Sequence, residues 1–90
     1  MVEKKVKIIN YSGLHARPAS EFVETAGKFQ SKIEIARLGE ESGAVNAKSI
    51  IFLLTLGLSQ GEEAVIFADG PDEQEAADTL VELIKSGFGE

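Results

Sequence analysis

The fold is decided by residues 2–27, which read VEKKVKIINYSGLHARPASEFVETAG. Within residues 2–9, apolar and charged residues alternate, and this period of two predicts a half-buried strand. From Ala16 the apolar residues recur at helical spacing, and Gly27 offers a helix end. A turn cluster, Asn10 to Gly13, separates the two patterns. The chain therefore begins with a strand, a turn and a helix.

The remaining segments repeat the same two periods. Alternating patterns predict three more strands over residues 33–38, 44–46 and 62–69, with a polar loop at 39–43. A second clear helix is predicted from Asp72 to Gly87, and Asp72 and Glu75 stand at capping-box spacing at its start. We therefore expect an α+β fold of order βαββαβα. This is an open-faced β-sandwich, with a four-stranded antiparallel sheet and three helices on one face.

The apolar run at residues 50–54 is ambiguous by pattern alone, because a buried strand and a short helix look alike at this length. In a helix, Ile50, Leu53 and Leu54 would face the core, while Ile51 and Phe52 would project from another side. The serine that precedes this run would then be its N-cap, the commonest use of serine at such a place.

Composition restricts the classes of function. Ninety residues predict a single domain, residues 1–90. The absence of cysteine and the single histidine exclude thiolate and multi-histidine metal sites, and we expect no metal and no cofactor. The net charge of −6 argues against nucleic acid as a ligand. No apolar run approaches the ~20 residues of a membrane span, and the N-terminus does not resemble a signal peptide. We expect a soluble, cytoplasmic protein.

The segment best suited to chemistry is Gly13-Leu14-His15-Ala16-Arg17-Pro18-Ala19. His15 lies where the turn becomes a helix, and the free N–H groups of a first helical turn bind anions. Pro18 fits that turn, and Arg17 adds a forked donor suited to phosphate. An imidazole beside such groups is suited to accepting and donating a phosphoryl group. From the residues alone, a histidine that merely caps the helix or lies on its surface is the commoner case, so both interpretations stay open.

Two separated motifs resemble the histidine-containing phosphocarrier protein (HPr) family of the bacterial phosphotransferase system. Residues 13–19 resemble its active-site signature, and Asn46-Ala47-Lys48-Ser49-Ile50 resembles its serine site. The resemblance implies that enzyme I phosphorylates His15 on Nδ1, with phosphoenolpyruvate as the ultimate donor. An enzyme IIA domain would then receive the group. Ala16, Arg17 and Pro18 would form the phosphate-binding site, with Arg17 also neutralising the phosphoryl charge. Such a protein is a carrier rather than a turnover enzyme.

The same resemblance favours a short helix after Ser49. Its exposed apolar corner, Ile50, Ile51, Phe52 and Leu54, would be the docking surface for partner proteins. Ser49 would be a regulatory phosphorylation site, with a serine kinase/phosphorylase and a transcription regulator as further partners. Ile51 and Phe52 stand where many members of the sugar branch carry methionine and glycine.

Alternatives within and beyond this family remain open. Lys48-Ser49 resembles the sugar branch of the family, whereas the long loop from Arg37 to Ala44 resembles the nitrogen-related branch. A regulatory docking module that acts through Ser49 is the alternative to a carrier, and the intact His15 favours the carrier. A small RNA-binding domain is disfavoured by the acidic charge. We expect a monomer, since a carrier presents one face to several partners in turn.

Overall fold

The computed structural model describes all residues, 1–90. Its main elements follow in the order β1 (Val2–Lys7), α1 (Ala16–Ala26), β2 (Lys32–Arg37), β3 (Val45–Asn46), α2 (Ile50–Leu56), β4 (Glu63–Asp69) and α3 (Glu73–Lys85). Short 3-10 turns lie at Glu41–Gly43 and Gly87–Gly89. This is the predicted βαββαβα order. None of the helices has the length and apolar character needed to cross a bilayer.

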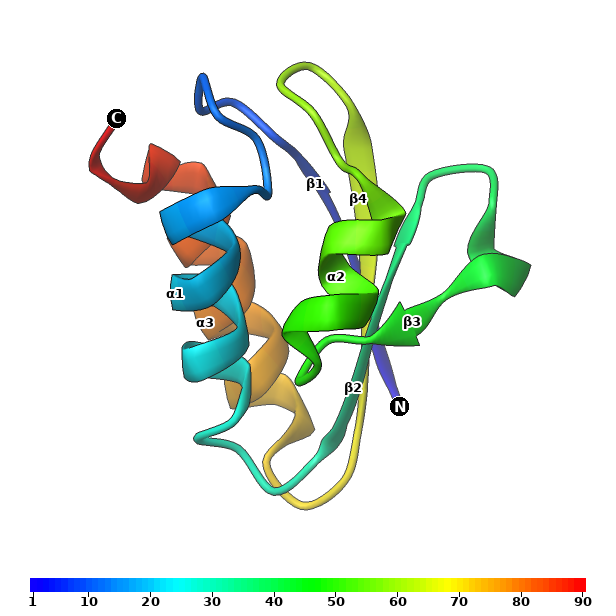
Figure 1. Ribbon diagram of the computed structural model, residues 1–90. Coiled ribbons are helices and arrows are strands. Elements are labelled where there is room, and N and C mark those ends of the chain that lie inside the picture. The colour runs from blue at the N-terminus through cyan, green and yellow to red at the C-terminus, as the bar shows by residue number, and fades with distance from the viewer.

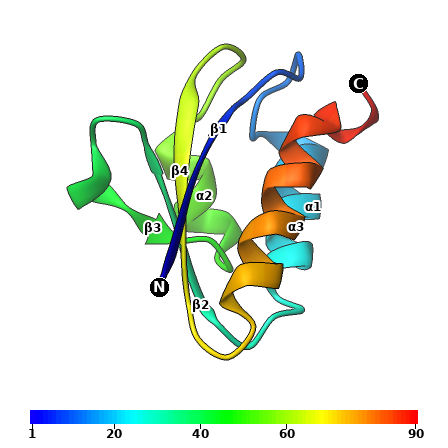
Figure 2. The ribbon, with the colours of Figure 1, turned by 180° about the vertical axis from the view of Figure 1, so that it is seen from behind.

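The four strands form one antiparallel sheet in the order β1-β4-β2-β3. The last strand in sequence is therefore central, with Ile66 of β4 opposite Ile35 of β2 and Ala64 opposite Val6 of β1. Helices α1 and α3 lie side by side against the same side of the sheet, and α2 lies next to α1 (Figures 1 and 2). The predicted open-faced sandwich is confirmed.

The core lies between the sheet and the helices. Alternate residues of the strands face inward, so Ile33 and Ile66 are fully buried, and so is Ile8, directly after β1. The helices contribute Phe22 from α1 and Leu80 from α3, which stand on the apolar stripes seen in the sequence. Twenty buried residues form this single cluster, which holds the two long helices rigidly on the sheet.

The ambiguous apolar run is a helix, so its interpretation as a strand is wrong. Ser49 caps it, because the Ser49 side chain accepts a hydrogen bond from the Phe52 amide at 3.4 Å, and Gly57 ends it with a φ of +66°. Of the three residues expected in the core, Leu53 is fully buried, but Ile50 is half-buried and Leu54 is 43% exposed. A seven-residue helix near the edge of the sheet directs only one of these side chains inward.

The predicted capping box at the start of α3 does not form. The Asp72 side chain makes no capping bond and instead accepts hydrogen bonds from the amides of Gln30 and Ser31 and from the Ser31 hydroxyl. The bond from the Ser31 hydroxyl is the main reason that the pKa of Asp72 lies below its usual value. Asp72 thus ties the loop between α1 and β2 to the start of α3, because its side chain is turned away from its own helix.

Candidate functional site

His15 is the N-cap residue of α1. It has extended backbone angles, φ −131° and ψ 164°, and its half-exposed imidazole makes no capping hydrogen bond. The next residue, Ala16, has a φ of +51°, in the left-handed region that is uncommon for residues other than glycine. The chain therefore turns sharply between the histidine and the helix. The structure does not support the interpretation of His15 as a side-chain cap.

Two backbone amides at this helix start are free. The N–H groups of Ala16 and Arg17 have no hydrogen-bond partner in the structure, and the amide of Ala19 reaches the His15 carbonyl only at 3.4 Å. Free N–H groups and the positive end of the helix dipole attract an anion. Pro18 has no N–H and is buried, so it shapes this turn but cannot donate to an anion. The two free donors directly follow the histidine in the chain.

Arg17 points into solvent. Its side chain is 74% exposed, and its Nε lies 3.6 Å from an Oε1 atom of Glu21, one helical turn later. An exposed ion pair of this kind contributes little to stability. The guanidinium is therefore free to leave Glu21 for an anion held at the start of α1.

The loop that carries His15 lies directly on the turn between α2 and β4. The Asn10 side chain closes the loop by donating to the Gly13 carbonyl at 2.9 Å, and the Leu14 amide donates to the Leu58 carbonyl at 2.9 Å. Gly13 has a φ of +67°, and a Cβ atom there would lie 2.6 Å from the Leu58 oxygen. Only glycine permits this close approach.

The same loop also contacts Glu90, a residue that no sequence pattern connects with it. The Glu90 carboxylate accepts hydrogen bonds from the Ser12 amide at 2.9 Å, the Ser12 hydroxyl at 2.8 Å and Asn10 Nδ2 at 3.1 Å. The hydrogen bond from the Ser12 amide is the main reason that the pKa of Glu90 lies below its usual value, and the positive charge of Arg17 lowers this pKa further. Phe88, buried with a φ of +55°, folds the chain back toward the loop. In the sequence, the aromatic residue Phe88 after α3 was the only sign that the C-terminal residues pack back onto the protein.

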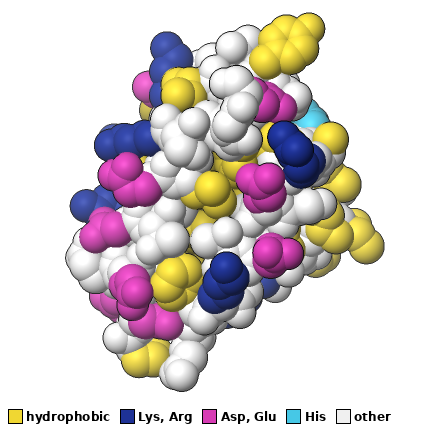
Figure 3. All heavy atoms as spheres, turned by 90° about the vertical axis from the view of Figure 1, so that its left-hand side faces the viewer, with side chains coloured by type: hydrophobic (Ala, Val, Ile, Leu, Met, Phe, Trp, Pro, Cys, Tyr) yellow, Lys and Arg dark blue, Asp and Glu magenta, His cyan; other side chains and the backbone are white.

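The predicted docking residues form an apolar corner of α2, which we define as Ile51, Phe52 and Leu54. Ile51 is 70% exposed and Phe52 is 55% exposed, and Ile50 contributes less because it is half-buried. Helix α2 packs against α1, whose start carries His15. On the face seen in Figure 3, hydrophobic side chains gather along the edge where the histidine reaches the surface, while charged side chains are scattered over the rest of the face among other groups. The structure thus brings the histidine and the apolar corner to one side of the molecule.

The pocket in the structure lies elsewhere. It is lined by Lys7, Arg37, Leu38, Gly61, Glu62 and Glu63, none of them a predicted site residue. The histidine site is instead an open surface without a substrate-sized cavity. A histidine on an open surface of this kind is accessible to the surface of another protein.

Comparison with known proteins identifies the family to which the chain belongs. Residues 2–86 match the family model described as the PTS HPr component phosphorylation site, and the chain belongs to this family of phosphotransferase-system phosphocarriers. It is 41% identical to the phosphocarrier protein HPr of Cupriavidus necator, over 100% of this chain and 98% of the relative. It is 46% identical to HPr of Haemophilus influenzae, over 93% and 95% of the two chains. Nothing in these relatives favours the nitrogen-related branch.

Solved structures agree with the fold. The crystal structure of HPr-C-His from Thermoanaerobacter tengcongensis is 49% identical, with a TM-score of 0.93 over 100% of this chain and 98% of that chain. Two further similar structures are described as dimers, of HPr from the same organism and of Crh from Bacillus subtilis, the latter by domain swapping. The expectation of a monomer for this chain therefore stays a prediction.

Proposed function

We propose that this chain carries a phosphoryl group on Nδ1 of His15, received from enzyme I and passed to an enzyme IIA domain of the sugar phosphotransferase system. The observation that carries the proposal is the pair of unpartnered amides, Ala16 and Arg17, directly after a half-exposed histidine. These amides donate no hydrogen bond within the fold, and their position at a helix start suits them to bind phosphate oxygens.

The transfer step needs only groups that the chain presents. In the neutral imidazole with its proton on Nε2, the lone pair of Nδ1 attacks phosphorus. The new bond joins Nδ1 to phosphorus while the bond between phosphorus and the donor atom of enzyme I breaks, and the donor keeps that electron pair. The amides of Ala16 and Arg17 then bind phosphoryl oxygens, and the Arg17 guanidinium turns from Glu21 to neutralise their charge. Transfer to enzyme IIA reverses these contacts.

The apolar corner of α2 supplies the docking surface for both partners. Exposed aliphatic and aromatic side chains stabilise protein interfaces when they are buried, at about 25 cal/mol for each Å² of apolar surface. A carrier that meets two partners in succession needs moderate affinity for each, and a corner of three large side chains suits that need. Enzyme I and enzyme IIA would therefore bind in turn and not together.

Incubation with purified enzyme I and labelled phosphoenolpyruvate tests the proposal. One acid-labile, base-stable phosphoryl group should appear on this chain and should leave it when an enzyme IIA domain is added. A chain that stays unlabelled while a known HPr in the same mixture is labelled would contradict the proposal.

Arg17→Lys should slow transfer while the fold stays intact. Lysine keeps the charge but loses the planar fork, and loss of a charge-assisted hydrogen bond costs about 1.5–3 kcal/mol, or about ten- to a hundredfold in rate. Single-turnover transfer from phosphorylated enzyme I measures the effect. Glu21→Gln is the matched control, because it removes the present partner of Arg17 and should leave the rate unchanged or faster. Equal rates for Arg17→Lys and the unmodified chain would show that the planar fork of Arg17 plays no part in transfer.

We further propose that phosphorylation of Ser49 regulates docking. The Ser49 hydroxyl caps α2 and lies at the start of the helix that carries the apolar corner, so a phosphate there would place about −2 charge beside Ile51 and Phe52. The helix start tolerates this charge. A partner that binds the corner must desolvate it, so affinity falls. A serine kinase/phosphorylase is the class of enzyme that would add and remove the group.

Ser49→Asp should imitate this phosphorylation in part. We expect its affinity for enzyme I to fall about tenfold, the order of effect of one unfavourable charge at an interface. Titration calorimetry compares it with Ser49→Ala, which removes the cap, costs about 1 kcal/mol of stability and should bind enzyme I normally. Equal affinities for the two variants would reduce Ser49 to a helix cap.

A further inference from the structure

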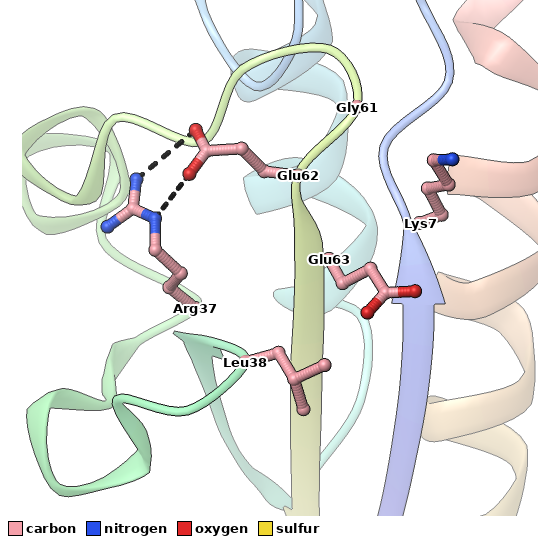
Figure 4. Close-up of a pocket in the computed structure, with 6 residues that line it drawn as sticks. All are labelled: Lys7, Arg37, Leu38, Gly61, Glu62 and Glu63. Carbon is pink, nitrogen blue, oxygen red and sulfur yellow. Dashed lines mark hydrogen bonds and ion pairs between the residues drawn. The ribbon is translucent and has the colours of Figure 1, made fainter.

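Two residues that line the pocket, Arg37 and Glu62, form an ion pair that has no part in the site described so far. Arg37, the last residue of β2, holds the carboxylate of Glu62 through two guanidinium nitrogens: Nε donates to Oε2, and Nη2 donates to Oε1 at 3.3 Å (Figure 4). Both side chains are largely covered, with 27% and 33% of their surfaces exposed. Forked pairs of this kind fix geometry more strongly than single surface contacts.

The same guanidinium also holds the end of α2. Arg37 Nη2 donates to the carbonyl oxygens of Leu56 and Gly57, at 3.1 and 3.2 Å, which a helix end leaves without partners of its own. Glu62 Oε1 in turn accepts a hydrogen bond from the Ser59 amide at 2.8 Å. The bond from Arg37 is also the main cause of the lowered pKa of Glu62, so this carboxylate is ionised at neutral pH. One ion pair thus holds both ends and the middle of the turn formed by residues 57–62.

The other side of this turn carries the histidine loop. The Leu58 carbonyl accepts from the Leu14 amide, next to His15, and the Gly61 amide donates to the Ile8 carbonyl at 2.8 Å. The Gln60 side chain donates to the Ile9 carbonyl at 3.0 Å. Gly13 packs directly on the backbone of the turn. The turn is therefore a layer between the ion pair and residues 8–14.

We infer that Arg37 and Glu62 are positioning residues for phosphoryl transfer at His15. They fix the turn at residues 57–62, the Leu58 carbonyl fixes Leu14, and Leu14 sets the direction from which the chain enters His15. Neither residue touches the phosphoryl group. The inference rests on the proposed function, since it assumes that His15 is the acceptor. It extends the site to a pair of residues 25 positions apart in the chain.

Two variants and one control test this inference. Arg37→Ala removes the fork and both carbonyl contacts. Glu62→Gln keeps an acceptor for the Ser59 amide but loses the charge, and it leaves the fold intact should Arg37→Ala unfold it. Lys32→Ala is the matched control, because it breaks an exposed 4.0 Å ion pair with Glu34 on the same strand, β2. Transfer from phosphorylated enzyme I and amide hydrogen exchange are measured for all four proteins at a temperature where each is folded.

We expect the transfer rate at saturating enzyme I to fall about tenfold for Arg37→Ala and about threefold for Glu62→Gln, with KM changed less than twofold. Exchange of the Leu14 amide should accelerate by a larger factor than that of the core amide of Ile66, while Lys32→Ala changes neither. The inference would be overturned if the two variants accelerated exchange of the Leu14 and Ile66 amides equally. It would also be overturned if the unmodified chain were phosphorylated and the variants accepted the phosphoryl group at the same rate. An unmodified chain that accepts no phosphoryl group would instead contradict the proposed function.

Discussion

His15→Ala should abolish phosphoryl acceptance and leave the free energy of unfolding within about 0.5 kcal/mol of its original value. The chain contains a single histidine, so no second imidazole can substitute for it. Its side chain is half-exposed and makes no hydrogen bond, so its removal leaves neither a cavity nor an unpaired buried group. Labelling with enzyme I and phosphoenolpyruvate measures the first effect, and urea denaturation measures the second.

The control for this variant is Ser20→Ala, an exposed change on the same helix, α1, which should keep full acceptance. Label retained by His15→Ala at a comparable rate would show that another residue is the acceptor. A large loss of stability in His15→Ala would show that the imidazole has a structural role.

Gly13→Ala should both destabilise the protein and slow transfer at His15. Alanine at a φ of +67° is strained, and its Cβ would meet the Leu58 oxygen at 2.6 Å and the Ser59 Cα at 2.9 Å, which are backbone atoms that cannot rotate away. Strain and overpacking together predict a loss of about 2–4 kcal/mol in the free energy of unfolding. The loop can relieve the clash only by moving away from the turn, and His15 moves with it. We therefore expect transfer to slow by about tenfold or more, since small misplacements of reacting groups have effects of this size.

Gly39→Ala is the control that separates backbone strain from overpacking. Gly39 has a φ of +89°, but a Cβ atom added there would have no neighbour within 4 Å, so only the backbone strain remains. Gly39→Ala should therefore lower the free energy of unfolding by about 1 kcal/mol and leave transfer at His15 normal. Equal losses for the two variants in urea denaturation, with equal transfer rates, would show that the close packing of Gly13 on the turn is unimportant.

Most of the fold was predictable because the apolar residues of its strands and long helices recur at the spacing typical of each element. Strand β1 alternates except at the exposed Lys4, and α1 and α3 carry apolar stripes at helical spacing, so local pattern and final burial agree. Helix α2 was not predictable from pattern, because its apolar run is only as long as a buried strand. Its identity depends on Ser49 at one end and Gly57 at the other, where capping and a left-handed residue favour the helix.

The candidate site was predictable only where its residues are contiguous. His15, Ala16 and Arg17 follow one another, so the sequence displays their proximity directly. The contacts of Glu90 with Ser12 and of Arg37 with Glu62 join residues 78 and 25 positions apart, and they depend on how the sheet and helices pack. The predicted capping box failed for the same reason, since Asp72 finds better partners in a loop 41 positions earlier than in its own helix.

The central claim is that Nδ1 of His15 carries the phosphoryl group, and nitrogen NMR tests it most directly. Because the chain has one histidine, a protein labelled with 15N-histidine gives a single pair of imidazole nitrogen signals. After treatment with enzyme I and phosphoenolpyruvate, the Nδ1 signal should shift and show coupling to phosphorus, while Nε2 keeps its proton. Coupling to Nε2, or a phosphoryl group on a hydroxyl oxygen with both imidazole signals unchanged, would contradict the account.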